Sequence, residues 1–230
     1  MDLLDLHRWD LSPKEAIAVQ RELAALVVCA GGPARVRCVA GVDCSIDRAG
    51  RRGTGAVVVL SYPELEVVEV AVAEAALSFP YVPGLLSFRE VPLLREAFRK
   101  LRGPVDLLLV DGQGYAHPRR FGLACHLGLL LDLPAIGVAK SRLLGEHTEP
   151  DRAAGSRSDL VDKGEVIGSV LRTRDGVKPL FVSSGHRIGL AEAEAWVLRC
   201  CRGYRLPEPT RLAHQAAAGR AFSTAGQASA

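Results

Sequence analysis

Apolar and polar positions along the chain repeat with two different periods, and the period changes from one segment to the next. Residues 12–28 place apolar side chains at helical spacing. The next apolar runs, at 36–42, 53–60 and 65–72, are rich in valine or alternate with polar residues, which is typical of strands. No helix is predicted between these runs, so we expect the three strands to pair as an antiparallel meander.

The N-terminal helix has a clear start signal. Ser12 can cap the helix, Pro13 suits its first position, and Glu15 completes a capping box. A Gly-Gly-Pro sequence at 31–33 ends the segment, and we expect the helix to run as far as Val28.

The second half of the chain alternates strands with helices. The predicted strands lie at 105–110, 135–138, 166–171 and 179–183, and the predicted helices at 90–101, 121–131 and 190–201. Residues 145–163 form a polar stretch between two of these strands. Three antiparallel strands followed by parallel strands predict an α/β fold, one mixed sheet with helices on both faces. That is the element order of the ribonuclease H-like fold.

Composition supports one folded domain. The chain has 230 residues, of which 48% are hydrophobic, and a net charge of +3, which together exclude disorder as the main state. We expect a single domain over residues 1–218 and a disordered tail over 219–230, which is rich in Ala, Gly and Ser.

The sequence also predicts where the protein resides. No apolar stretch approaches the ~20 residues of a membrane helix, and the N-terminus does not have the pattern of a signal peptide. The six cysteines include no Cys-x-x-Cys pair, so we interpret them as buried thiols and not as zinc ligands. We expect a cytoplasmic protein without a membrane partner.

Acidic residues follow two of the predicted strands at the same point. Asp43 ends the first strand and Asp111 ends the strand at 105–110, while Glu90 begins a helix. If the two strands are parallel neighbours, their carboxylates converge and repel each other. A divalent cation removes that repulsion, and Mg²⁺ prefers carboxylate ligands. The alternative for each acid is a solvated residue at the end of an element.

Other motifs that could carry chemistry are incomplete. The Gly112-Gln113-Gly114 sequence follows a strand, but His117 stands where a dinucleotide-binding loop has its third glycine. The chain contains no GxxxxGK[ST], GxSxG or HExxH sequence. The carboxylates therefore remain the strongest candidate site.

The segments around these acids resemble the endonuclease V family, which nicks nucleic acid near inosine, the product of adenine deamination. The most specific stretches are Pro80-Tyr81-Val82-Pro83-Gly84, continued by Phe88-Arg89-Glu90, and Asp111-Gly112-Gln113-Gly114, continued by His117-Pro118-Arg119. The resemblance covers roughly residues 35–215, with matching segments at 41–43, 80–90, 110–114, 117–120, 136–143, 162–165, 184–187 and 203–211.

This resemblance implies a metal-dependent endonuclease for DNA repair. Family members have the ribonuclease H-like fold, use Mg²⁺ or Mn²⁺, and cleave the second phosphodiester bond 3′ to inosine, leaving a 3′-hydroxyl and a 5′-phosphate. The implied metal ligands are Asp43, Glu90 and Asp111, and the implied further catalytic residues are Lys140 and His214. We expect a monomer whose partner is inosine-containing nucleic acid.

The resemblance also implies residues that hold the nucleic acid. Tyr81, between Pro80 and Pro83, matches a wedge that fills the helix when the base is flipped out, which recovers part of the lost stacking.

A pocket for that base is expected beside the wedge. Inosine differs from adenine by a carbonyl and a ring N–H in place of an amino group. Gly84 and Gly112 let the backbone approach the base, and Leu86 and Leu143 are expected to be its apolar walls.

Positive charge is grouped near these segments. His117 and Arg119 are expected to hold phosphates near a helix N-terminus. Residues 112–143 and 199–211 each carry four basic residues against one acid. This grouping predicts salt-sensitive binding of modest non-specific affinity.

Two other functions stay open at this point. One is a different ribonuclease H-like nuclease, specific for junctions or hybrids. The other is an inosine-binding module without catalysis. The residues do not decide between DNA, including single-stranded DNA, and inosine-containing RNA as the substrate.

Overall fold

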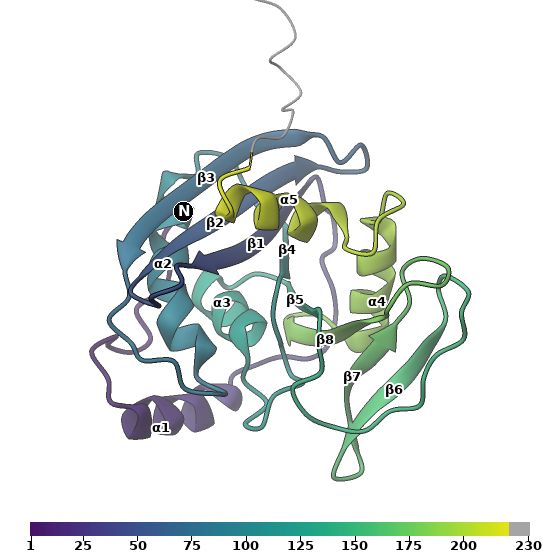
Figure 1. The fold of residues 1–230 in the computed structure, drawn as a ribbon, viewed down its shortest axis with the longest axis horizontal. Coiled ribbons are helices and arrows are strands. Elements are labelled where there is room, and N and C mark those ends of the chain that lie inside the picture. Colours follow the sequence, from purple (N-terminus) through teal and green to yellow (C-terminus); the bar gives the residue numbers. More distant parts are fainter. Residues whose placement is uncertain (221–230) are drawn as a thin grey trace, which may run out of the picture.

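The structure is a computed structural model of the chain, and it describes residues 1–220. One eight-stranded sheet has the order β3-β2-β1-β4-β5-β8-β7-β6. Figure 1 shows α5 on one side of this sheet and α2 and α3 on the other. The elements are α1 (Pro13–Ala24), β1 (Cys38–Ile46), β2 (Arg52–Ser61), β3 (Val67–Ala76), α2 (Leu86–Lys100), β4 (Leu107–Val110), α3 (Leu123–Leu131), β5 (Ala135–Ala139), β6 (Arg157–Asp162), β7 (Glu165–Leu171), β8 (Leu180–His186), α4 (Leu190–Arg199) and α5 (Glu208–Ala217).

Alternate strand residues build two separate apolar layers. Successive side chains of a strand point to opposite faces of its sheet. Accordingly Val39 packs in a cluster with Trp196 of α4 and Leu212 of α5, whereas Ala40 packs in a cluster with Val91 of α2. Helix α1 lies outside this arrangement and packs against α2 and α3 through two smaller clusters. The sheet is thus covered on both faces.

The pairing confirms the expected mixed sheet. β1, β2 and β3 form the antiparallel meander, and β4 pairs parallel with both β1 and β5. β8, β7 and β6 then extend the sheet with antiparallel pairs. β6 lies inside the polar stretch at 145–163, where the sequence predicts no strand.

Two predicted helix boundaries need correction, and one helix was not predicted at all. α1 ends at Ala24, earlier than expected, because Ala25, Leu26 and Val27 continue only in tighter turn bonds. α2 begins at Leu86, so Glu90 lies one turn inside the helix and not at its start. Helix α5 was not predicted, although apolar residues at 212, 213, 216 and 217 follow helical spacing and are buried.

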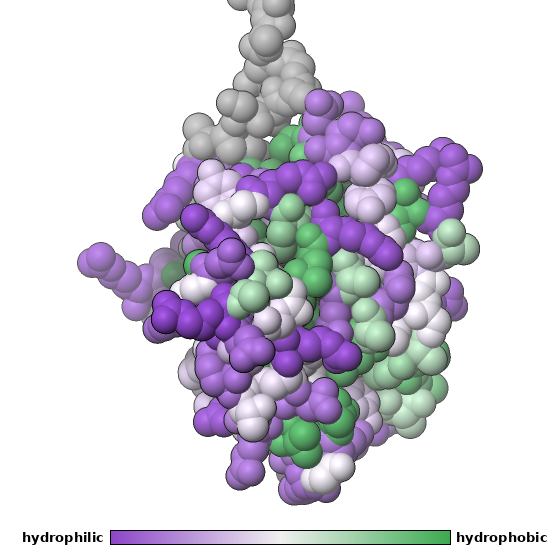
Figure 2. All heavy atoms as spheres, turned by 90° about the vertical axis from the view of Figure 1, so that its right-hand side faces the viewer, coloured by the Kyte–Doolittle hydropathy of each residue, from purple (hydrophilic) through white to green (hydrophobic). Residues whose placement is uncertain are grey.

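The surface of the protein is mostly polar. Figure 2 shows a face covered mostly by hydrophilic side chains, with hydrophobic residues in smaller areas between them. Within residues 1–220, no helix combines the length and apolar character needed to cross a membrane. The expected tail at 219–230 lies, from residue 221 onward, outside the described residues.

Candidate active site

Asp43 and Asp111 meet because their strands are parallel neighbours. Val42 of β1 is in register with Val110 of β4, so the next residue on each strand lies at the same end of the sheet. The backbone N–H of Asp111 donates to the Val42 carbonyl at 2.9 Å. Asp43 is buried, and its Oδ1 accepts from the N–H of Cys44 at 2.8 Å. Asp43 lies within β1, which continues to Ile46 along β2, so the prediction that it ends its strand is wrong, whereas Asp111 directly follows β4. The parallel pairing nevertheless holds the two carboxylates close together.

A glycine in β1 brings a histidine to this pair. A Cβ at Gly41 would lie only 1.8 Å from the Pro209 carbonyl oxygen, so only glycine lets the first turn of α5 rest on the strand. Five residues further along, α5 places Nδ1 of His214 at 2.7 Å from Oδ2 of Asp43. Since Asp43 and Gly41 share a face of β1, the close approach of α5 determines this contact.

Lys140 completes the group from the end of β5. Its ammonium forms an ion pair with Oδ2 of Asp111. The same Nζ lies 3.5 Å from Nδ1 of His214. One cation and one imidazole thus stand over two carboxylates.

The acids of the site are difficult to keep ionised together. Burial, followed by the charge of Asp111, raises the pKa of Asp43 to about 6. Burial, followed by the charges of Asp43 and Asp111, raises the pKa of Glu90 to about 8. Repulsion between carboxylates in a site with little water has this direction, and a bound cation would reverse it.

The residues present fit a divalent metal ion. Ligand atoms of Asp43, Asp111 and His214 all lie within 4.8 Å of one another. Oδ2 of Asp111 is buried and pairs with the ammonium of Lys140, which a divalent ion at this position would replace or join as its positive partner. Glu90 does not belong to this group of three. Its carboxylate is nevertheless near it, since its charge helps to raise the pKa of Cys44, the residue next to Asp43. Oxygen-rich donors of this kind suit Mg²⁺ or Mn²⁺.

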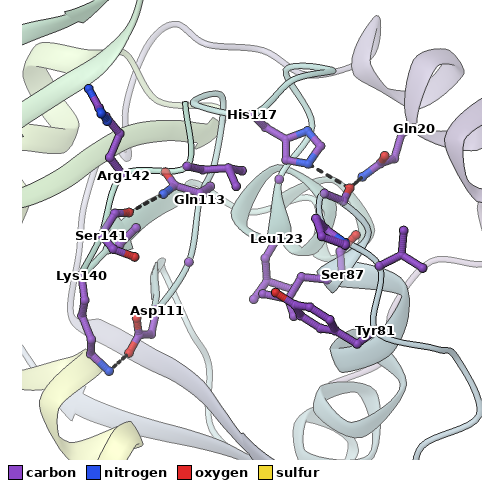
Figure 3. Close-up of a pocket in the computed structure, with 18 residues that line it drawn as sticks. Gln20, Tyr81, Ser87, Asp111, Gln113, His117, Leu123, Lys140, Ser141 and Arg142 are labelled. Carbon is purple, nitrogen blue, oxygen red and sulfur yellow. Dashed lines mark hydrogen bonds and ion pairs between the residues drawn. The ribbon is translucent and has the colours of Figure 1, made fainter. Parts of the chain in front are cut away.

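A cavity of about 390 Å³ opens beside the carboxylates. Figure 3 shows Asp111, Lys140 and Ser141 on one side of it, Leu123 in the middle, and Ser87 and Tyr81 on the other side. Its lining includes most of the residues expected to contact nucleic acid, namely Tyr81, Pro83, Gly84, Leu86, Gly112, His117 and Leu143. The structure thus brings residues from three distant parts of the sequence around one space.

Three donors hold the loop on the Tyr81 side of this cavity. The carbonyl of Gly84 accepts from Nε2 of Gln20 at 3.0 Å, Nε2 of His117 at 3.0 Å and Nη2 of Arg119 at 2.7 Å. Gly84 has a φ of +78°, which favours glycine there. Burial lowers the pKa of His117 to about 4, so its ring is neutral and donates from Nε2. We call Gly84, Gln20, His117 and Arg119 the Gly84 cluster.

The expected phosphate-holding residues and the wedge lie in different surroundings. His117 is buried and Arg119 is half-buried, and both are directed at Gly84. Tyr81 keeps 69% of its surface exposed, and Pro80 and Pro83 beside it are exposed as well. The aromatic ring therefore stands free at the rim, next to the cavity.

Sequence reasoning missed three polar residues of the cavity. Gln20 reaches it from α1, Ser87 from α2, and Gln113 from the loop after β4. Nε2 of Gln113 donates to the Ser141 carbonyl at 2.9 Å, while its Oε1 is buried without a partner. Only Gln113 had a signal in the sequence, since it lies between two glycines already noted.

Comparison with known proteins agrees with this geometry. The family model for Endonuclease V matches residues 21–215. The Endonuclease V of Dehalococcoides mccartyi is 56% identical over 213 residues, covering 93% of this chain and 96% of its own length.

Solved structures of Endonuclease V proteins have the same fold as this chain. The crystal structure of Endonuclease V from Streptomyces avermitilis has a TM-score of 0.88 at 42% identity, covering 95% of this chain and 97% of its own. Endonuclease V of Ciona intestinalis, solved in complex with a 24mer DNA containing an inosine followed by a ribo-adenosine, has a TM-score of 0.79 at 30% identity, covering 90% and 95%.

Proposed function

The chain belongs to the endonuclease V family, and from this membership we propose that it is a DNA repair endonuclease that acts at inosine. The proposed reaction is hydrolysis of the second phosphodiester bond 3′ to the inosine, which leaves a 3′-hydroxyl and a 5′-phosphate. The proposed cofactor is Mg²⁺, for which Mn²⁺ substitutes.

One observation carries this proposal. The carboxylates of Asp43 and Asp111 converge at the edge of a cavity that is large enough for a base and has an exposed aromatic residue, Tyr81, at its rim. A nuclease that flips a base out needs a site for the phosphate, a site for the base and a side chain to take the base's place. All three lie together here.

Asp43 and Asp111 are the proposed metal ligands, with Glu90 beside them. A divalent ion held there would supply positive charge for the scissile phosphate and a water that ionises more easily. Lys140 pairs with Oδ2 of Asp111 and thereby orients that carboxylate. It also brings a positive charge to the phosphate side of the site.

His214 is suited to accept a proton. A carboxylate accepts hydrogen bonds and does not donate them, so Nδ1 of His214 donates to Asp43 at 2.7 Å. The other ring nitrogen of the neutral imidazole is then an acceptor. With about half of this side chain exposed, that nitrogen can reach a water or a phosphate oxygen.

Tyr81 is the proposed wedge and the 390 Å³ cavity the proposed base pocket. Flipping a base costs a few kcal/mol of stacking, and an inserted ring recovers part of it. Leu86 and Leu143 offer apolar contact, and Gly84 and Gly112 let the backbone come near the base.

The test uses 5′-labelled oligonucleotides that carry a single deoxyinosine. With Mg²⁺ we expect one nick at the second phosphodiester bond 3′ to the inosine, and no nick when adenine replaces the inosine or when EDTA is present. Asp43→Ala and Asp111→Ala are expected to abolish nicking and to retain binding in a gel shift.

Other outcomes would favour the other functions. Binding of the deoxyinosine strand by the wild-type protein without any nick in Mg²⁺ or Mn²⁺ would indicate a binding module. Cleavage of junctions or hybrids without preference for inosine would indicate a different nuclease. Parallel assays with inosine-containing RNA determine which nucleic acid is preferred.

The domain and the compartment are also proposals. We propose that residues 1–218 form one nuclease domain that acts as a monomer. We propose that it works in the cytoplasm, since all six cysteines are unpaired.

A further inference from the structure

A continuous chain of hydrogen bonds leads from the backbone near the N-terminus to the base pocket. Nδ1 of His7 contacts the Arg8 carbonyl oxygen at 2.6 Å, and Nε2 of His7 contacts Nε2 of His126 at 2.8 Å. Nδ1 of His126 in turn contacts Oγ of Ser87 at 3.0 Å. Ser87 lines the cavity that is proposed to hold the base. The mechanism described above uses none of these three side chains.

The carbonyl oxygen of Arg8, at the start of this series of hydrogen bonds, sets the direction of every bond in the series. A backbone carbonyl only accepts, so Nδ1 of His7 carries a proton and its Nε2, in the neutral ring, is an acceptor. His126 must then donate from Nε2 and accept at Nδ1. The hydroxyl of Ser87 therefore donates to His126, and only its lone pairs remain for a ligand.

Packing keeps both rings neutral and in place. His126 is fully buried in α3, and burial lowers its pKa well below the usual value. Burial also lowers the pKa of His7. The ring of Trp9 stacks on His126 with centroids 5.5 Å apart, and the His7 ring lies 4.4 Å from Trp9. The N-terminal segment thus covers His126 from outside.

We propose that Ser87 is a specificity-determining residue whose oxygen accepts a hydrogen bond from the ring N–H of inosine, and that His126 and His7 are positioning residues that direct its hydroxyl away from the base. This inference rests on the proposed function. Adenine presents a ring nitrogen lone pair where inosine presents an N–H, so an oxygen that cannot donate favours inosine and disfavours adenine.

Two side-chain oxygens of the cavity could accept from this N–H, Oγ of Ser87 and Oε1 of Gln113, and Ser87 is the better placed. Oε1 of Gln113 is also buried and without a partner, but its amide is tied to the carbonyl of Ser141 in an exposed loop. Ser87 is only 2% exposed, lies across the cavity from them (Figure 3), and its hydroxyl bonds to the fully buried His126. An acceptor held by a buried partner is fixed more firmly than one tied to an exposed loop, and it therefore discriminates more strongly.

The test compares binding of two oligonucleotides that differ in one base. One carries deoxyinosine and the other carries deoxynebularine, a purine with a ring nitrogen lone pair and no carbonyl. Affinities are measured by fluorescence anisotropy in EDTA, so that no strand is cleaved. Any contact to the carbonyl is present in wild type and variant alike, and it cancels when each variant is compared with wild type on the same oligonucleotide.

Ser87→Ala is expected to weaken binding of the deoxyinosine strand about tenfold and not to weaken binding of the deoxynebularine strand. Ser169→Ala removes another buried hydroxyl, one without a hydrogen-bond partner in β7, and is the matched control with no expected change. An equal loss on both oligonucleotides would show a merely structural role and overturn the proposal. The proposal would also be overturned if Gln113→Ala, and not Ser87→Ala, lost affinity only for the deoxyinosine strand.

His7→Phe tests the direction of these hydrogen bonds. It keeps the aromatic packing and removes Nε2 of His7, the acceptor for His126. Without that acceptor, His126 can protonate Nδ1 and the Ser87 hydroxyl can turn to donate. We expect the affinity for deoxynebularine to rise several-fold, and ¹⁵N NMR to show His126 leaving the Nε2–H form that it has in the wild type. An Nδ1–H form in the wild type, or an unchanged preference in the variant, would overturn the proposal.

These outcomes are separate from failure of the proposed function. If the wild type neither binds nor nicks the deoxyinosine strand in preference to an adenine strand, the proposed function itself fails. If it does so and Ser87→Ala has no base-specific effect, only the role of Ser87 fails.

Discussion

The two sides of the cavity differ in how their polar groups are satisfied. On one side Asp43, Glu90 and Asp111 stand close together, and the pKa values of Asp43 and Glu90 are raised by burial and by mutual repulsion. On the other side the Gly84 cluster gives one carbonyl three donors. The carboxylate side is therefore incomplete without a cation, whereas the Gly84 side is complete in the protein alone. One side of the cavity thus carries the groups suited to catalysis, and the other side fixes the shape of the pocket.

The largest effect that tests this comparison is the loss of a carboxylate. Asp111→Asn is expected to lower the nicking rate at least about a thousandfold, equivalent to about 4 kcal/mol, because it removes a proposed metal ligand. It should not lower the melting temperature in EDTA, since it also removes repulsion. Single-turnover nicking and thermal unfolding measure the two effects.

Asp106→Asn is the matched control for that variant. Oδ2 of Asp106, just before β4, accepts from the N–H groups of Arg37 and Cys38 at 2.8 and 2.9 Å. This change should lower stability by up to about 1 kcal/mol and leave nicking intact. The opposite pattern, with Asp106→Asn inactive and Asp111→Asn active, would refute the assignment of the site.

The two sides should also respond to pH in opposite directions. In the folded protein the pKa of His117 is about 4, against a usual 6.5, so the unfolded chain binds the proton first and stability falls as pH drops from about 6.5 to 4. The pKa of Glu90 is about 8, against 4.5, so its contribution is lost as pH rises from about 4.5 to 8. The effect amounts to about 3 kcal/mol for His117 and about 5 kcal/mol for Glu90.

Denaturant unfolding in EDTA at several pH values measures both slopes. His117→Gln should flatten the acid side of the curve, and Glu90→Gln should flatten the side above pH 5. If both variants change the slope of stability against pH in the same direction, the two sides do not differ as described.

Metal binding should stabilise only the carboxylate side. At a Mg²⁺ concentration about ten times its Kd, the wild type should gain about 1.4 kcal/mol, because only the folded chain holds the ligands together. Asp111→Asn should gain much less at the same concentration. Thermal unfolding with and without Mg²⁺ measures this, and equal gains in both proteins would place the ion elsewhere.

The smallest effect is expected on the Gly84 side. Arg119→Ala loses the bonds to Gly84 and Gln20, and we expect about 1 kcal/mol less stability and several-fold lower kcat/KM. Arg120→Ala is the control, since Arg120 pairs outside the cavity with Asp162 and Glu165.

Salt dependence distinguishes two roles of Arg119. If it only shapes the pocket wall, the slope of log affinity against log salt stays unchanged in the variant. A slope smaller by about 1 would instead support the phosphate contact that the sequence suggested.

Several of the basic residues counted from the sequence are occupied within the protein. Arg120 pairs with two acids, Arg211 pairs with Glu208, and Arg205 donates to backbone carbonyls including that of Lys140. The net charge of a window is additive along the chain, but what it offers a partner depends on these internal contacts. Arg142, at the cavity, also donates to a backbone carbonyl, that of Gly145 at 3.0 Å, but it does so on an exposed loop.

The sequence by itself determined the fold class and that Asp43 and Asp111 meet, although Asp43 lies within β1 and not at its end. Strand periodicity and the order of elements suffice for that, because parallel neighbours bring their ends to the same edge of the sheet. The capping box at Ser12 was also visible, since its contacts span three residues. Family resemblance supplied Lys140 and His214, which no local pattern distinguishes.

Only the tertiary structure decided what surrounds those carboxylates. It showed that α5 rests on Gly41 and so carries His214 to Asp43, and that Gln20 joins a carbonyl 64 residues away in the sequence. It also connected His7 to His126 across 119 residues, and through it to Ser87. These contacts depend on which faces pack together, and hydrophobic periodicity shows which face is buried but not which partner covers it.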